Sequence, residues 1–166
     1  CAFEITVTGG KIGEVKPAAF ALGTVVDLND LFYSTPARLK FLRSDKAESR
    51  AIADVVKRLA IAEPKVTFTL KDISRGGEGR LIFKYDPDLG DHWRAMKSRL
   101  AQVLGTNFTD NSIMINTERE EIKLFGYAAL PTYSRGAAVQ QFFFVNGRPI
   151  KDKLLIGALR AAYSDL

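Results

Sequence analysis

The sequence predicts a mixed α and β protein that folds in two unequal parts. Segments in which apolar and polar residues alternate, which is typical of strands, are interspersed with segments whose apolar residues repeat at helical spacing. A run of turn-forming residues, DPDLG at positions 86–90, interrupts this pattern near the middle of the chain. We therefore expect a domain boundary there, with one domain at residues 1–88 and a second at residues 89–166.

The composition is that of an ordinary globular protein, with 46% hydrophobic and 26% charged residues. The chain carries 24 Lys and Arg against 19 Asp and Glu, a formal net charge of +5. This mild excess is compatible with a nucleic-acid partner, but many proteins without such a partner share it. Charge alone leaves the function open.

The single cysteine, Cys1, has no second cysteine with which to form an internal disulfide, so a reducing, cytoplasmic setting is expected. The sequence has no run of 18 apolar residues and no secretory leader, so we expect no membrane association. Because the first methionine is Met96 and strand-like residues begin at once, we interpret the chain as a piece of a longer protein.

The first part opens on a predicted strand at residues 2–8, where apolar and polar residues alternate, followed by a turn at Gly9 and Gly10. Residues 21–28 are more continuously apolar and predict a second, more buried strand. Thr35 is a candidate helix N-cap, with Pro36 suited to the first helical position.

The clearest helix follows Ser44, a candidate cap, and is expected to end near Glu63 because Pro64 disfavours helix in the residue before it. Its inward face is predicted to carry Ile52, Val55, Val56 and Leu59. Residues 65–70 and 80–85 alternate again and are expected to form a hairpin through a glycine-rich link.

The second part is predicted to begin with a helix at residues 91–104 that stops at Gly105. Three strands are expected next, at residues 112–116, 121–129 and 139–145. A closing helix at residues 152–163 would place one apolar face inward: Leu154, Leu155, Ala158, Leu159 and Ala162. The expected inward residues of the first of these helices are Trp93, Met96, Leu100, Val103 and Leu104.

Three features of the kind found at catalytic sites have simpler explanations. His92 is the only histidine and has no metal-binding partners nearby in sequence, so a structural or surface role is expected. Glu118, Glu120 and Glu121 are close enough for acid–base or metal chemistry, but a solvated turn explains them better. The GGEG stretch of the hairpin link lacks the Lys-Ser/Thr of a phosphate-binding loop, so a plain hairpin loop is favoured.

Two basic clusters are more suggestive. The first runs through Arg38, Lys40, Arg43, Lys46 and Arg50 and continues with Lys57 and Arg58. Such side chains suit phosphate contacts, and a solvated helix face explains them equally well. The second comprises Arg148, which the Asn146-Gly147 turn would expose beyond the preceding strand, with Lys151 and Lys153 at the positive end of the last helix. The sequence leaves open whether the two clusters form one surface.

Two longer stretches carry a family resemblance: GTVVDLNDLFYSTPARLKFL at residues 23–42 and QQFFFVNGRPIKDKLL at residues 140–155. They resemble two signatures of the MutL family of DNA mismatch repair proteins. The resemblance implies the end of a GHKL-type ATPase α/β sandwich at residues 1–88 and an incomplete transducer domain, like domain 2 of ribosomal protein S5, at residues 89–166. One departure is Ser34, where the family usually has Asn.

The resemblance also implies an ATP and magnesium site that lies mostly outside this chain. Gly23 and Thr24 match the family residues that help to bind the adenine end of the nucleotide. The catalytic Glu, the magnesium-binding Asn and the Asp-x-Gly-x-Gly stretch have no counterpart here. The full-length protein is therefore expected to be an ATPase, and this chain alone to be inactive, with no catalytic or metal-binding residue of its own.

For DNA, the family's basic residue after Asn-Gly-Arg corresponds to Lys153, the first candidate for backbone contact. Arg58, Lys40 and Arg43 match other basic positions of the family's central groove, and Arg148 and Lys151 complete the set of candidates. The partners implied are DNA, a mismatch-recognition protein of the MutS type and a second copy in the full-length protein.

The function expected is part of an ATP-driven mismatch repair protein that binds DNA without strong sequence preference and couples mismatch recognition to strand incision or excision. A DNA-binding and transducing module without activity of its own is the alternative from another class. An S5-like RNA-binding protein is a third possibility, which is less favoured because the phenylalanines suit a buried strand better than base stacking.

Overall fold

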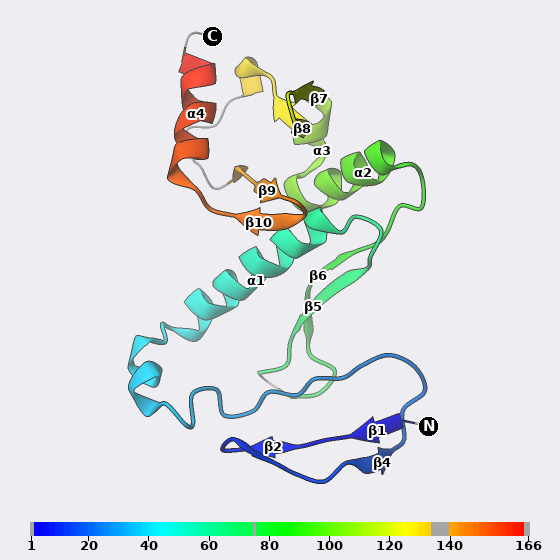
Figure 1. Ribbon diagram of the computed structural model, residues 1–166, viewed down its shortest axis with the longest axis vertical. Helices are drawn as coiled ribbons and strands as arrows, with labels where there is room; N and C mark the ends of the chain where they lie inside the picture. Colours follow the sequence, from blue (N-terminus) through cyan, green and yellow to red (C-terminus); the bar gives the residue numbers. More distant parts are fainter. Residues whose placement is uncertain (1, 75, 134–139, 165–166) are drawn as a thin grey trace. The chain divides into compact units, whose positions relative to one another are not determined.

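The computed structural model describes residues 2–74, 76–133 and 140–164, and it divides into two compact units, residues 1–48 and 49–166. Each unit is described by itself. The division falls earlier than the predicted domain boundary near residue 88, which stays a prediction. Mixed helices and strands run through the described residues, as the sequence predicts (Figure 1).

The first unit consists of short paired strands and a single 3-10 helix (Figure 1). β1 (Ala2–Glu4) pairs with β4 (Lys16–Ala18), and β2 (Val7–Thr8) pairs with β3 (Lys11–Ile12), both antiparallel. Gly9 and Gly10 make the predicted turn, with φ angles of 56° and 82° that favour glycine. The predicted first strand is therefore present but broken between β1 and β2.

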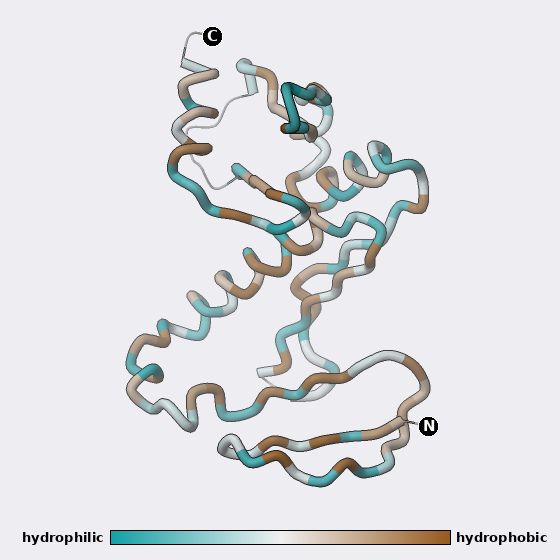
Figure 2. Tube along the Cα trace, viewed as in Figure 1, coloured by the Kyte–Doolittle hydropathy of each residue, from teal (hydrophilic) through white to brown (hydrophobic). Residues whose placement is uncertain are grey.

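The predicted buried strand at residues 21–28 is wrong. This segment is extended without strand pairing, and all of its residues are exposed. A strand requires a hydrogen-bonded neighbour, and the short strands of this unit pair only with one another among the described residues. Figure 2 shows brown, apolar positions along this part of the chain, in which Val26 is 84% exposed.

Thr35 does precede a helix, η1 (Pro36–Phe41), and Pro36 is its first residue, as predicted. The Thr35 side chain makes no capping hydrogen bond; its backbone carbonyl accepts from the amide of Arg38 instead. α1 (Asp45–Ala62) then begins after Ser44, whose carbonyl accepts from two amides of the first turn, and ends before Pro64, as predicted. Its predicted inward face is only partly covered, since Ile52 is 53% and Val55 is 56% exposed.

The second unit contains the predicted hairpin of residues 65–85 and, after it, the predicted helix and strands in order. β5 (Phe68–Asp72) pairs with β6 (Arg80–Tyr85), and β7 (Ser112–Arg119) pairs with β8 (Ile122–Ala129), both antiparallel. α2 (His92–Leu104) is capped by Asp91 and ends at Gly105, whose φ is 94°. Three elements were not predicted: α3 (Thr106–Asp110), η2 (Pro131–Tyr133) and β10 (Arg148–Ile150).

The last predicted strand is shorter than expected. β9 (Phe143–Val145) covers only its end, and Val139 lies outside the described residues. β9 and β10 form a tight hairpin through Asn146 and Gly147, whose φ angles of 49° and 76° suit the turns that join strands. α4 (Lys153–Ser164) closes the chain, but no described residue of it is buried and Leu154 is 83% exposed, so its predicted inward face is not covered here.

The core of the second unit joins the end of α1 to α2 and α3 through Ile61, Leu100 and Phe108. Phe142 and Phe144 pack against it, which agrees with their predicted place in a core strand. Other partly buried side chains also pack on this cluster: Met96, Val103, Leu104, Tyr127, Ala129 and Tyr133.

A buried arginine holds the elements around this core together. The Arg99 side chain, in α2, is 1% exposed and donates hydrogen bonds to four backbone carbonyls. One acceptor is Ala60 at 2.9 Å, in the last turn of α1, where helix carbonyls lack intrahelical partners. A second is Pro64 at 3.2 Å, just after the helix ends. The others are Val66 at 2.6 Å, before β5, and Asp86 at 3.3 Å, after β6.

Candidate nucleic-acid interface

Asp54 is the point at which two predicted DNA-contact residues meet. One oxygen of its carboxylate, Oδ2, accepts from Nε of Arg58 at 3.1 Å and from Nζ of Lys151 at 2.9 Å. Asp54 and Arg58 are one turn apart on α1, a spacing at which side chains interact, and Lys151 comes from the connection between β10 and α4. The structure therefore brings residues of both basic clusters together within the second unit.

The charges around Asp54 change the pKa of its carboxyl group. Burial favours the neutral acid, but hydrogen bonds and charges from Lys151 and Arg58 outweigh it and hold the pKa of the Asp54 carboxyl below its usual value. The carboxylate is therefore ionised at neutral pH, and it neutralises part of the positive charge of this face.

Arg58 is anchored far more tightly than a surface arginine. Its side chain is 11% exposed, and its guanidinium lies over the ring of Phe142, 4.7 Å from the centroid. This cation–π contact and the Asp54 carboxylate compensate the burial of the charge. Nη1 of Arg58 and Oε1 of Gln141 are both buried without a hydrogen-bond partner among the described residues.

The β9–β10 hairpin presents Arg148 differently from the prediction. The Asn146-Gly147 turn is present, but Arg148 does not leave the strand: it begins β10 and pairs with Val145. The turn reverses the chain into a second strand, and the short strand keeps the Arg148 side chain exposed at the turn end.

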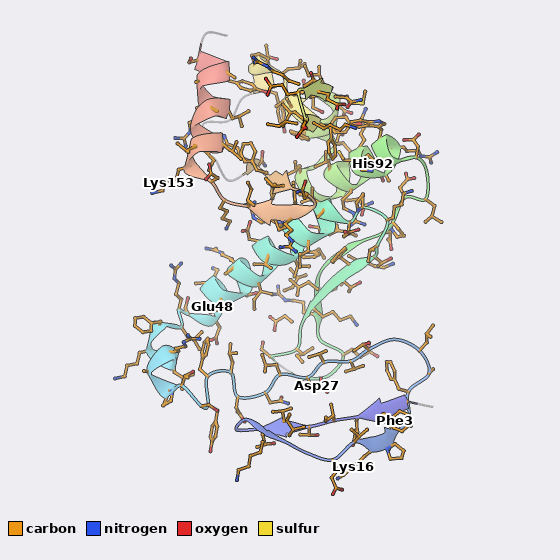
Figure 3. The ribbon with its side chains drawn as sticks, in the orientation of Figure 1. Phe3, Lys16, Asp27, Glu48, His92 and Lys153 are labelled. Carbon is orange, nitrogen blue, oxygen red and sulfur yellow. The ribbon has the colours of Figure 1, made fainter. Side chains whose placement is uncertain are left out.

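Lys153 is the first residue of α4 and is exposed; in Figure 3 its side chain projects away from the helix. The anion site expected at this helix N-terminus is already filled. Asp152 Oδ1 accepts from the amides of Leu154 and Leu155, both at 2.9 Å, as an N-cap. Lys151 and Lys153 thus flank a helix end at which Asp152 already occupies the amides of Leu154 and Leu155, so the two lysine charges are the main groups that an anion would meet.

Lys40 and Arg43 belong to the first unit. Lys40 is exposed in η1, and Arg43 is exposed between η1 and α1, where its amide donates to Glu48 at 2.9 Å. Their neighbour Arg38 lies over the ring of Phe32, 5.9 Å from the centroid. These two residues remain predicted DNA contacts.

Gly23 and Thr24, the predicted nucleotide-binding residues, are both exposed in the extended segment of the first unit. Gly23 has a φ of 105°, a conformation that favours glycine, and the exposed Thr24 hydroxyl has the chemistry to hydrogen-bond a base or a water. Within the described residues, no three of the His, Cys, Asp and Glu side chains gather into a possible metal site. In the same residues, no helix is long and apolar enough to cross a membrane.

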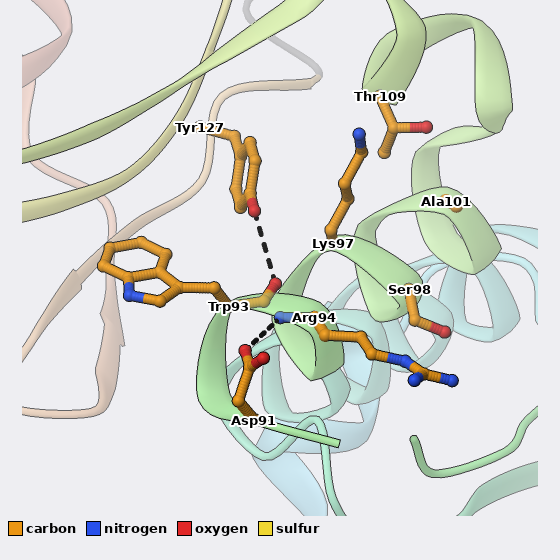
Figure 4. Close-up of a pocket in the computed structure, with 8 residues that line it drawn as sticks. All are labelled: Asp91, Trp93, Arg94, Lys97, Ser98, Ala101, Thr109 and Tyr127. Atoms are coloured by element: carbon orange, nitrogen blue, oxygen red, sulfur yellow. Dashed lines mark hydrogen bonds between the residues drawn. The ribbon is translucent and has the colours of Figure 1, made fainter. Parts of the chain in front are cut away.

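A depression of about 440 Å³ along α2 corresponds to no motif that the sequence predicted (Figure 4). It is lined by aromatic, basic and small polar side chains together with Asp91 and Ala101. Tyr127 closes one side by donating a hydrogen bond to the carbonyl of Trp93 at 3.3 Å. Arg94 is held by Asp88 at 3.2 Å. Nearby, His92 packs edge-on against Trp93 and Phe125, the structural role predicted for it.

The sequence analysis also missed Asp54 and Phe142 as parts of the basic site. The spacing of Asp54 and Arg58 was a readable signal for an ion pair on one helix face. The contact with Phe142 had no signal, because the two residues come from distant parts of the chain.

Comparison with curated proteins decides the family. The chain is 48% identical over 164 residues to the DNA mismatch repair protein MutL of Allorhizobium ampelinum, which covers 99% of this chain. It is 51% identical over 161 residues to the protein of the same name from Rhizobium meliloti. The chain belongs to the MutL family. It spans about a quarter of the length of these MutL relatives, 25% in both cases.

A family model and solved structures locate the region within MutL. A model described as "DNA mismatch repair protein, C-terminal domain" matches residues 100–166. The Aquifex aeolicus MutL ATPase domain complexed with ADP is similar at 29% identity and a TM-score of 0.70, covering 95% of this chain and 56% of that one. The N-terminal domain of another DNA repair protein, 19% identical with a TM-score of 0.75, shares the fold. The chain thus corresponds to the ATPase-domain region of MutL-family proteins.

Proposed function

We propose that this region of MutL binds the DNA backbone without strong sequence preference, within an ATP-driven protein that couples mismatch recognition to strand incision or excision. The observation that carries the DNA-binding part is the cluster in the second unit, where Arg58, Lys151 and Lys153 come from two distant segments. Exposed lysines beside an anchored arginine favour phosphate contact, which is independent of base sequence.

Nucleotide binding is proposed for Gly23 and Thr24, with ATP and magnesium as the cofactors of the full-length protein. The support is the similarity to an Aquifex aeolicus MutL ATPase domain complexed with ADP. The exposed hydroxyl of Thr24 would join the hydrogen-bond network around the adenine when the nucleotide is bound. The phosphates and the metal ion would be held by other parts of the protein.

The domain organisation proposed is the end of the ATPase sandwich at residues 1–88, followed by an S5-like transducer domain. A mismatch-recognition protein of the MutS type and a second copy of the full-length protein are the proposed partners, and the cytoplasm the proposed location. The names of the curated relatives, which are DNA mismatch repair proteins, support this context.

Lys153→Glu tests the proposed DNA contact in the whole protein. Binding to labelled duplexes of unrelated sequence, followed by fluorescence anisotropy, should weaken on all of them alike, because a phosphate contact carries no sequence information. The slope of log K against log salt should become shallower by about 1.

Lys97→Glu is the control, since Lys97 is an exposed lysine of α2 outside the proposed interface and the change in net charge is the same. It should leave most of the affinity in place. Equal losses in the two variants, or a loss confined to one DNA sequence, would contradict the proposed contact.

A further inference from the structure

The carboxylate of Asp54 makes contacts with the basic cluster of the kind that a phosphate would make. A single oxygen receives two cationic donors, Nε of Arg58 at 3.1 Å and Nζ of Lys151 at 2.9 Å. Arginine and lysine side chains bind oxygens of the nucleic-acid backbone with the same kind of charge-assisted hydrogen bonds.

We propose that Asp54 is an internal counter-anion that holds Lys151 in the free protein and yields it to a backbone phosphate when DNA binds. This inference rests on the proposed DNA binding of the same cluster. It adds a competing ion pair that limits the affinity of the cluster for DNA. Asp54 is accordingly a positioning residue that lowers the affinity for DNA.

Lys151 is the partner that changes, because the two cations are held very differently. The Lys151 side chain is 69% exposed and its ammonium group lies on a flexible stem. The Arg58 side chain is 11% exposed and is fixed by Phe142 on one side and Asp54 on the other. Asp54 therefore keeps Arg58 as its partner after Lys151 has moved.

The exchange of Asp54 for a phosphate as the partner of Lys151 loses little free energy. An ion pair as open to solvent as that of Lys151 with Asp54, whose side chain is 36% exposed, contributes little net stability. A phosphate contact in its place releases counterions from the DNA, which favours the exchange at low salt. One oxygen of the neighbouring acid, Asp152, is engaged by the amides of Leu154 and Leu155, and Asp152 makes no ion pair with Lys151 in this structure.

Asp54→Asn in the whole protein tests the inference. Removal of the carboxylate charge should raise the affinity for a fluorescein-labelled duplex by about two- to five-fold, the range expected when one solvent-exposed ion pair no longer competes. The slope of log K against log salt should steepen by about 0.9, because Lys151 makes one more phosphate contact. Asp110→Asn, at the exposed end of α3, makes the same change in net charge and should leave both values nearly unchanged.

A second background separates this exchange from simple repulsion between Asp54 and DNA. In protein that carries Lys151→Gln, the Asp54→Asn change should give no gain in affinity, since no lysine remains to be released. A gain of the same size in both backgrounds overturns the inference. If Lys153→Glu leaves DNA binding intact, the proposed function fails instead, whatever Asp54 does.

A measurement on the unaltered protein covers the case in which Asp54→Asn weakens folding, since Arg58 would lose its anionic partner. Carboxyl carbon shifts followed by NMR give the pKa of Asp54 with and without the duplex. The pKa should rise on binding, because one of the cations that lowers it has left. An unchanged pKa in the complex overturns the inference.

Discussion

Arg99 shows at the scale of one residue how a buried charge is tolerated with no salt bridge to its guanidinium among the described residues. Its four carbonyl partners and the rings of Phe68 and Tyr85, 5.7 and 5.9 Å from the guanidinium, replace water around the cation. Burial lowers the pKa of Arg99, while the nearby Tyr85 and Asp86 raise it in part. Arginine starts from so high a pKa that it stays charged at neutral pH.

Arg99→Met should destabilise the second unit strongly. Methionine fills similar space but leaves the carbonyls of Ala60 and Val66 without their donor, and each such buried group costs about 1–3 kcal/mol. Urea unfolding monitored by circular dichroism measures the loss. Arg94→Met, on the exposed side of the same helix at 73% side-chain exposure, is the control and should change the midpoint little. Similar midpoints for the two variants would contradict the role given to Arg99.

At the scale of elements, the N-terminus of α4 depends on Asp152, which accepts from two amides at 2.9 Å. Asp152→Ala should destabilise the first turn by about 0.5–2 kcal/mol, the usual cost of losing an N-cap. Hydrogen exchange of the Leu154 and Leu155 amides measures it directly. Asp152→Ser retains a capping oxygen and should restore most of the protection; equal exchange in both variants would show that the cap does not hold this turn.

The same scale shows what local sequence determines. Alternation and turn residues predicted the β5–β6 hairpin and the two strands β7 and β8, because both signals are local in sequence. They failed at residues 21–28, where a strand needs a partner that the local pattern does not specify. Helix ends at Asp91 and Gly105 were predictable because capping is local.

The basic site, too, could be predicted where it depends on local sequence and could not where it depends on contacts between distant segments. Lys151 and Lys153 could be placed near a helix start from the turn and cap residues around them. The burial of Arg58 against Phe142 could not be predicted, since it depends on how α1 packs beside a hairpin that follows much later in the chain. The exposure of each cation, and with it its availability to DNA, thus required the structure.

At the scale of the whole molecule, the contacts of Arg99 cross the predicted domain boundary near residue 88. Its donors lie on α2, after that boundary, and all four acceptors lie before it. The hydrogen bonds between the Asp86 backbone and the Gln102 side chain, at 2.9 and 3.0 Å, cross it too. A boundary predicted from a run of turn-forming residues therefore need not separate two parts that unfold independently.

We accordingly expect the end of α1, β6 and α2 to open as one cooperative unit in native-state hydrogen exchange. Segments that share a buried network lose it together, so their slowest amides should report one common free energy of opening. Arg99→Met should lower that value on both sides of residue 88 by the same amount, because the variant removes donors on one side and satisfied acceptors on the other. Separate opening free energies before and after residue 88 would instead mean that the two sides are independent and that the Arg99 contacts do not couple them.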